Sequence, residues 1–190
     1  KDWWKENGKS VILGAVVGLG GLFGWRYYQD SVTAAQESAS ESYTKAVQQL
    51  AESGAEGEAA LQGFIDANND SQYAVLAALQ LAKVQVEAGE FDEALAQLEW
   101  AKSATEDQAL VSVISFRLAR LKSEQGGFDD ALTELSAIDD QSWAGRVAEL
   151  KGDILLRKGD SEGAYTAYVE AQQAKDASQA LQMKLDDLAK

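Results

Sequence analysis

The fold of this chain is decided by the stretch LAKVQVEAGEFDEALAQLEWA, which occupies residues 81–101. Two later stretches repeat its pattern: LARLKSEQGGFDDALTELSAI at residues 118–138, and KGDILLRKGDSEGAYTAYVEA at residues 151–171. In each copy a helical pattern stops at a glycine, and a second helical pattern starts shortly after it. The three copies therefore predict three helix pairs along residues 73–175.

The repeated positions each have a physical role. A glycine accepts the left-handed backbone that often ends a helix, and the glycines at this position are Gly89, Gly126 and Gly159. A small residue in the second helix lets two helices approach closely, and these residues are Ala94, Ala131 and Ala164. We expect an aromatic residue such as Phe91 to fill the elbow and an acid such as Asp92 to cap the second helix. The third copy has Ser161 in place of the aromatic, so we expect its elbow to be looser.

The spacing of the copies and the signature G-x-[FY]-x-x-A-x-x-x-[LY]-x-x-A resemble the tetratricopeptide repeat. This resemblance implies an α-solenoid, and no strand pattern competes with it anywhere in the sequence. Solenoids need a closing helix with a polar outer face, and residues 176–190 have the apolar spacing for that role.

In tetratricopeptide arrays the first helix of each pair lines a concave face, with its second, fifth, ninth and twelfth positions facing the groove. The resemblance therefore implies a partner groove made of Leu76, Leu79, Lys83, Val86, Val113, Phe116, Arg120, Ser123, Arg146, Glu149, Asp153 and Leu156. Apolar residues mixed with Lys83, Arg120 and Arg146 would suit a helix or extended segment with an acidic edge. The alternative is that flanking helices of the chain itself, residues 32–50 or 176–190, fill this groove.

The composition excludes several classes of function. The chain has 17 Lys and Arg against 31 Asp and Glu, a net charge of −14, and no His, Cys or Pro. Without His or Cys it cannot form a Ser-His-Asp or Cys-His relay or a Cys-based zinc site, so we expect no enzyme and no cofactor. Its acidic surface repels the phosphate backbone, so we expect no nucleic-acid partner.

One motif imitates a metal site. The residues Asp66-x-Asn68-x-Asp70 copy the opening of a calcium loop. The glycine that the loop requires is Ser71, however, and the closing glutamate is Ala77. We therefore expect a helix-capping turn at this position, and no bound metal.

The start of the chain has the pattern of a membrane anchor. Residues 11–25 read VILGAVVGLGGLFGW and contain no charged residue. A helix from Trp4 to Trp25 would span roughly 31 Å, which matches the hydrocarbon core of a bilayer. Aromatic residues at both ends are placed like interfacial belts. The sequence thus predicts a single transmembrane helix within residues 1–28.

Two other interpretations of this stretch are less favourable. A cleaved signal peptide would have a small-residue site close to the apolar run, but the bulky Arg26-Tyr27-Tyr28 separates the run from Val32-Thr33-Ala34. A buried helix of a soluble domain would be weakened by its glycines, each by roughly 1 kcal/mol relative to alanine. In a membrane the same glycines permit close helix packing, and they are Gly14, Gly18, Gly20, Gly21 and Gly24.

The distribution of basic residues predicts the orientation of the anchor. Lys1, Lys5 and Lys9 precede the span, and only Arg26 follows it closely. The amino terminus is therefore expected in the cytoplasm, and the repeat domain in the periplasm. Between the two, residues 29–72 predict a linking helix and an atypical first helical pair, with a break at residues 54–57 and a stop at residues 68–71.

The whole chain resembles the YfgM-like ancillary subunits of the bacterial Sec translocon. The resemblance is carried by the sequences ENGK (6–9), GWRY (24–27), RLAR (117–120) and SWAGRVAELKGD (142–153). It implies a non-enzymatic inner-membrane protein that associates with the translocon channel. It also implies association with a membrane-anchored periplasmic chaperone of the prolyl-isomerase type, PpiD. The alternative is an envelope assembly or structural scaffold unrelated to secretion.

Overall fold

The structure is a computed structural model that describes the backbone of residues 2–188 and the side chains of residues 14 and 16–188. Within that range the chain forms helices and short turns, and no strand. The elements are α1 (Asp2–Ser53), α2 (Ala55–Ala67), α3 (Gln72–Ala88), α4 (Phe91–Ser103), α5 (Gln108–Glu124), α6 (Phe128–Ser136), the short 3-10 helix η1 (Gln141–Trp143), α7 (Ala144–Lys158), α8 (Ser161–Gln173) and α9 (Leu181–Leu188). The prediction of an all-α fold is confirmed. The chain divides into two compact units, Lys1–Lys45 and Ala46–Lys190.

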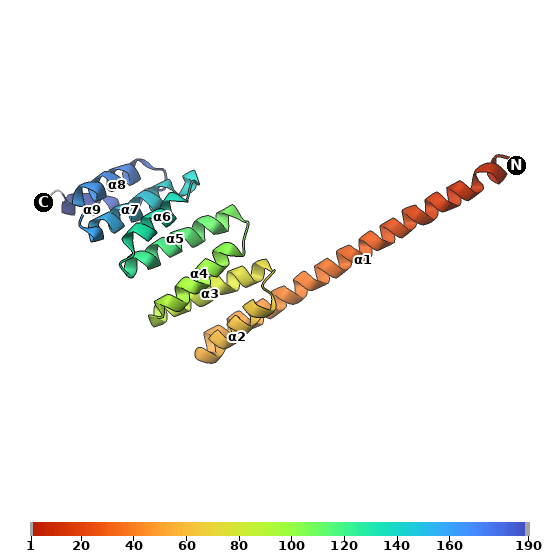
Figure 1. Cartoon of the computed structure of the whole chain (residues 1–190), viewed down its shortest axis with the longest axis horizontal. Helices are drawn as coiled ribbons and strands as arrows, with labels where there is room; N and C mark the ends of the chain where they lie inside the picture. The colour runs from red at the N-terminus through yellow and green to blue at the C-terminus, as the bar shows by residue number, and fades with distance from the viewer. Residues whose placement is uncertain (1, 189–190) are drawn as a thin grey trace. The chain divides into compact units, whose positions relative to one another are not determined.

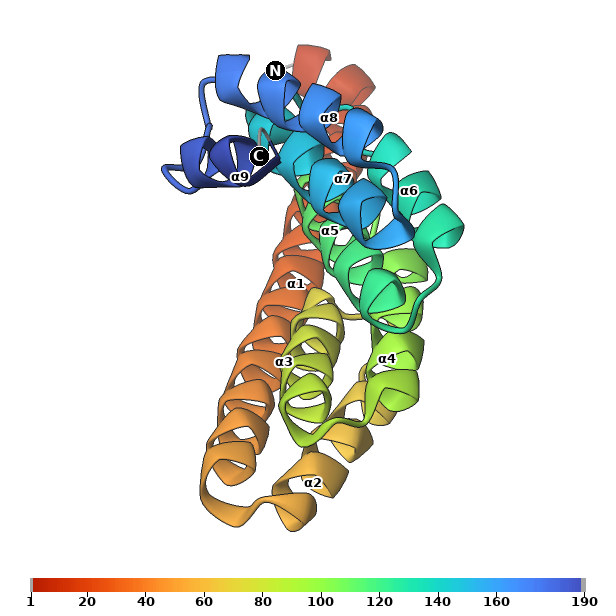
Figure 2. The same cartoon turned by 90° about the vertical axis from the view of Figure 1, so that its left-hand side faces the viewer.

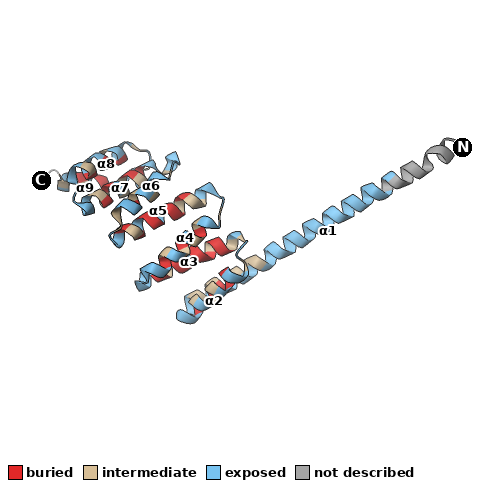
Figure 3. Cartoon of the chain, viewed as in Figure 1, coloured by how far each residue is buried: buried red, intermediate tan, exposed pale blue. Residues whose placement is uncertain are grey.

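The first unit consists of α1 up to Lys45 (Figure 1). The helix runs without interruption from the predicted anchor into the predicted linking segment. Large apolar side chains such as Val17, Phe23 and Trp25 are more than 60% exposed in this unit. Figure 3 shows most of the described part of α1 in the colour of exposed residues. At the five glycines of the predicted span, an added Cβ would meet no other described atom within 4 Å. The packing partner predicted for these glycines is therefore not found among the described residues of the chain.

The predicted span from Trp4 to Trp25 lies only partly within the described side chains, because residues 4–13 and 15 fall outside them. Among the side chains that are described, no helix has a stretch long and apolar enough to cross a bilayer.

The second unit is a stack of helix pairs. The pair α3 and α4 is followed by α5 with α6 and by α7 with α8, and Figure 2 shows α3 next to α4 and α5 next to α6. The left-handed glycines are where the repeat predicts them, with φ of 82° at Gly89, 83° at Gly126 and 93° at Gly159. The small residues of the second helices are fully buried between the helices, and they are Ala94, Ala131 and Ala164. These elements form three helix pairs, and the prediction of a tetratricopeptide-like solenoid is confirmed.

The expected caps of the second helices are wrong for the first two pairs. Phe91 and Phe128 are themselves the first helical residues, and no side chain caps α4 or α6 from the position before them. Asp92 and Asp129 lie instead in the first turn, where a negative charge interacts favourably with the positive end of the helix dipole. The third elbow, expected to be looser, is the one with a side-chain cap, because Asp160 accepts a hydrogen bond of 2.8 Å from the Gly163 amide.

The break before α2 is shorter than the sequence predicts. The chain turns at Gly54 alone, with φ of 51°, and Gly57 already lies inside α2. The geometry at Gly57 leaves no room for a side chain, since an added Cβ would meet the backbone of Gln49 and Leu50 at the end of α1. The helix-capping turn predicted after α2 is confirmed, because the Asn68 side chain donates a 2.8 Å hydrogen bond to the carbonyl of Phe64.

The helix α9 closes the stack at its carboxyl end. Leu181 and Leu185 are buried in the same apolar cluster as Ala148, Tyr168 and Ala171. This cluster belongs to α7, α8 and α9, so α9 covers the apolar face that the last pair would otherwise expose.

Candidate partner groove

Three neighbouring hollows lie along the first helices of the stack. The first hollow, of about 360 Å³, lies between α5 and the pair α3 and α4. The second, of about 410 Å³, and the third, of about 200 Å³, lie between α5 and α7. Arg120 lines all three, so they form one continuous surface, which we call the partner groove.

Most of the residues predicted for the groove line these hollows. Lys83 and Val86 line the first hollow, and Arg120 lines all three. The others at the second and third hollows are Phe116, Ser123, Arg146, Glu149, Asp153 and Leu156. The structure does not bring Leu76, Leu79 or Val113 to any of the three, and Leu79 is only 7% exposed.

The first hollow also contains residues that the repeat pattern missed. Phe91 and Leu98 reach it from α4, the second helix of its pair, and Arg117 and Leu121 extend the surface on α5. The pattern assigned four positions of the first helix to the groove, so it could not include a residue of the second helix. Arg117 lies three residues before Arg120, one turn away on the same face of α5, and a wider helical stripe would have included it.

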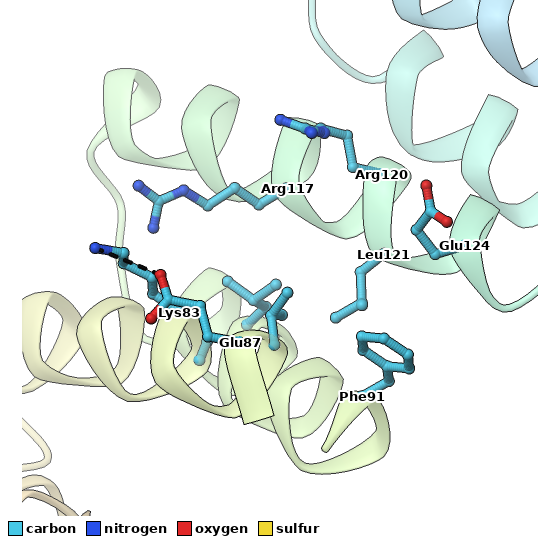
Figure 4. A pocket seen from close by; sticks show the side chains of 10 residues that line it. Lys83, Glu87, Phe91, Arg117, Arg120, Leu121 and Glu124 are labelled. Atoms are coloured by element: carbon cyan, nitrogen blue, oxygen red, sulfur yellow. Dashed lines mark ion pairs between the residues drawn. The ribbon is translucent and has the colours of Figure 1, made fainter. Parts of the chain in front are cut away.

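The charges around the first hollow are unevenly paired. Lys83 forms an ion pair of 3.7 Å with Glu87, and Glu124 is held by Arg157 at 2.8 Å. Arg117 and Arg120, in contrast, have no ion-pair or hydrogen-bond partner among the described residues. Figure 4 shows these two side chains extending from α5 on the side of the hollow opposite Lys83 and Glu87.

Two acidic residues of α7, Glu149 and Asp153, are paired within the chain. The ammonium group of Lys184 on α9 lies 2.9 Å from a Glu149 carboxylate oxygen and 2.6 Å from one of Asp153. The hydroxyl of Tyr168 donates a 2.7 Å hydrogen bond to the same Asp153 carboxylate. Burial and the neighbouring Asp153 carboxylate together raise the pKa of Tyr168 well above its usual range. The closing segment, residues 176–190, therefore supplies a cation to this end of the groove.

An aromatic and basic cluster borders the third hollow. The rings of Phe116 and Trp143 lie 5.3 Å apart between centroids, and the Arg146 guanidinium lies 5.1 Å from the centre of the Trp143 ring. The amino end of α7 is capped by a residue far away in the sequence, because Asp176 accepts hydrogen bonds from the amides of Gly145 at 2.8 Å and Arg146 at 3.2 Å. The loop before α9 thus fixes both the start of α7 and the position of Arg146.

The surface of the partner groove is partly apolar and partly charged. It combines exposed apolar side chains with charged groups on rigid helices, which suits the recognition of a helix or an extended segment. Within the described part of the chain, no group of three or more Asp and Glu side chains is placed to hold a metal ion.

Comparison with known proteins defines the class first. The family model of the tetratricopeptide repeat-like domain matches residues 1–190, that is, the whole chain. A solved structure of MamA from Desulfovibrio magneticus RS-1 has a TM-score of 0.64 with 13% sequence identity. The match covers 79% of this chain and 82% of that one, and it supports the fold alone.

Two curated relatives define the family. The ancillary SecYEG translocon subunit of Haemophilus influenzae is 36% identical over 99% of this chain and 93% of its own length. The protein of the same name from Escherichia coli K12 is 36% identical over 100% of this chain and 93% of its own length. The chain belongs to the family of ancillary SecYEG translocon subunits, and the resemblance noted in the sequence is confirmed.

Proposed function

We propose that this chain is a non-enzymatic adaptor of the Sec translocon that is anchored in the inner membrane. Its tetratricopeptide-like unit would bind protein partners on the periplasmic side and hold a folding factor of the PpiD type near newly exported chains. The observation that carries this proposal is the 36% identity, over nearly the full length, to relatives named as ancillary translocon subunits.

The exposed side chains of α1 support the anchor. In water, Val17, Phe23 and Trp25 would leave more than 60% of their surface exposed. A bilayer would cover these apolar side chains and would place Trp25, Tyr27 and Tyr28 at its interface. The lysines that precede the span favour a cytoplasmic amino terminus, with the unit Ala46–Lys190 in the periplasm.

The partner groove supports the role of an adaptor. Its hollows lie on three rigid first helices and offer apolar surface beside Arg120 and Arg146. Basic groups on a chain with a net charge of −14 favour a partner segment that has an acidic edge.

The proposal is tested by purifying the tagged full chain from membranes in a mild detergent and identifying the proteins that remain bound. We expect the subunits of the translocon channel together with a prolyl-isomerase-type chaperone. Recovery of the chain with cell-wall machinery and without the channel would favour the envelope scaffold and contradict the proposal.

The same purification tests the groove. Arg120→Glu should reduce the amount of bound partner, because it reverses a charge that lines all three hollows. Lys151→Glu is the matched control, since Lys151 is an exposed cation outside these hollows. A fall in thermal stability with unchanged partner binding would mean that Arg120 is structural and that the partner docks elsewhere.

A further inference from the structure

The floor of the first hollow is apolar and accessible. Val86 is 39% exposed and Phe91 is 37% exposed, although both are large apolar residues. Ala82, Leu98 and Leu121 complete this surface. A volume of about 360 Å³ is large enough to admit an apolar side chain from another protein.

Two unpaired arginines border this floor. In the unit Ala46–Lys190, Arg146 lies near Asp176 and Arg157 is paired with Glu124. Arg117 and Arg120 contact no carboxylate among the described residues, although acids outnumber bases in the chain. The guanidinium group binds carboxylates in a paired, directional geometry, so two free guanidinium groups form a strong local preference for acids.

The two arginines also indicate how many acidic groups the partner segment presents. They lie three residues apart on α5 and are therefore on adjacent turns of one face. Each guanidinium can bind a carboxylate of its own, and Glu87 and Glu124 at the rim already have cationic partners in the chain. A terminal carboxylate would supply only one anion, whereas an internal acidic segment supplies two.

We propose that the first hollow is an anchor site for an internal acidic segment of a protein partner. An apolar side chain of that segment packs on Val86 and Phe91, and two flanking Asp or Glu side chains bind Arg117 and Arg120. The proposal deepens the proposed function and depends on it for the class of partner, a protein.

A synthetic peptide tests the anchor site directly. The probe is a short fluorescent peptide, blocked at both ends, in which a leucine pair is flanked by glutamates, and the comparison peptide has glutamine at those positions. Fluorescence anisotropy with the full chain in detergent should give about tenfold tighter binding for the glutamate peptide. Raising the salt concentration should weaken that binding.

Matched variants locate the binding. The double substitution Arg117→Gln with Arg120→Gln should weaken binding of the glutamate peptide about tenfold. Lys151→Gln with Lys175→Gln removes the same charge from exposed positions outside the partner groove and should leave the affinity nearly unchanged. Far-ultraviolet circular dichroism of each variant checks that its helices are formed.

Several results would overturn the anchor site. Equal binding of the two peptides would exclude recognition of acidic side chains, and equal weakening by the two double variants would indicate only a general charge effect. A third peptide, without glutamates but with a free terminal carboxylate, would contradict the internal segment if it bound more tightly. Co-purification of the channel with the unmodified chain is read separately. If the unmodified chain retains the channel but does not prefer the glutamate peptide, the anchor site alone is refuted, and if the unmodified chain does not retain the channel, the proposed function is refuted.

Discussion

At the residue scale, the carboxylate of Glu134 on α6 contacts two lysines. One of its carboxylate oxygens lies 2.7 Å from the Lys102 ammonium group, and the other lies 2.9 Å from that of Lys122. These lysines belong to α4 and α5, so this one carboxylate joins the first two helix pairs. Its side chain is only 15% exposed, which reduces solvent screening of the two contacts.

We expect Glu134→Gln to destabilise the folded chain by about 1–2 kcal/mol at neutral pH, because two charge-assisted hydrogen bonds are lost. Burial raises the pKa of Glu134, but the hydrogen bonds from Lys102 and Lys122 outweigh it and hold this pKa below its ordinary value of 4.5. A lowered folded-state pKa means that the contribution is present above pH 4.5 and is lost as the pH falls through the folded-state value.

Urea unfolding of the full chain in detergent at pH 7 and pH 3 measures this effect. The difference in unfolding free energy between the unmodified chain and Glu134→Gln should narrow at the lower pH. Glu93→Gln is the control, since Glu93 is exposed and contacts no basic side chain among the described residues. If the difference in unfolding free energy were the same at both pH values, the stabilisation by Glu134 would not depend on its negative charge, which would contradict this prediction.

At the scale of the helices, close approach depends on small residues at defined positions. The end of α1 and the start of α2 meet at Gly57, where no side-chain atom fits against the backbone of Gln49 and Leu50. The helices α7 and α8 meet at Gly152, where an added Cβ would overlap the ring of Tyr168. These contacts set the spacing of neighbouring helices in the stack.

We expect Gly57→Ala to destabilise the second unit by about 1–3 kcal/mol, because α1 and α2 must move apart to admit the methyl group. Gly63→Ala on the same helix should be neutral or stabilising by up to about 1 kcal/mol, since no atom lies within 4 Å of its added Cβ and alanine favours a helix. Thermal unfolding monitored by circular dichroism compares the two. Similar melting temperatures for both variants would show that the close approach is not required.

The sequence predicted the helix pairs because each pair repeats the same glycine and alanine at the same spacing. It also predicted most of the residues that line the three hollows, since residues such as Lys83 and Val86 share one helical stripe on α3. It could not predict contacts between distant segments. Asp176 lies after α8 in the sequence but caps the amino end of α7, which precedes α8. Phe91 enters the first hollow from the second helix of its pair. Neither contact has a periodic signal in the sequence.

At the scale of the whole molecule, the chain combines a helix rich in exposed apolar residues with a helical stack that has its own core. The unit Ala46–Lys190 has its core between the helix pairs and is closed by α9. The proposed anchor would hold this unit at the membrane surface.

We expect both ends of the region after the anchor to lie in the periplasm. The chain contains no cysteine, so Ser38→Cys and Ser178→Cys each introduce a single reactive thiol at an exposed position. Both should react with a membrane-impermeant thiol reagent once the outer membrane is opened. Protection of both until the inner membrane is lysed would reverse the proposed orientation.

The central claim is that this chain is a direct partner of the Sec channel, and binding between purified components tests it most directly. The full chain, labelled and kept in detergent, is titrated with purified channel in lipid nanodiscs, and empty nanodiscs serve as the control. We expect saturable binding to the channel that exceeds binding to the empty nanodiscs. Equal signals from channel-containing and empty nanodiscs would contradict the account.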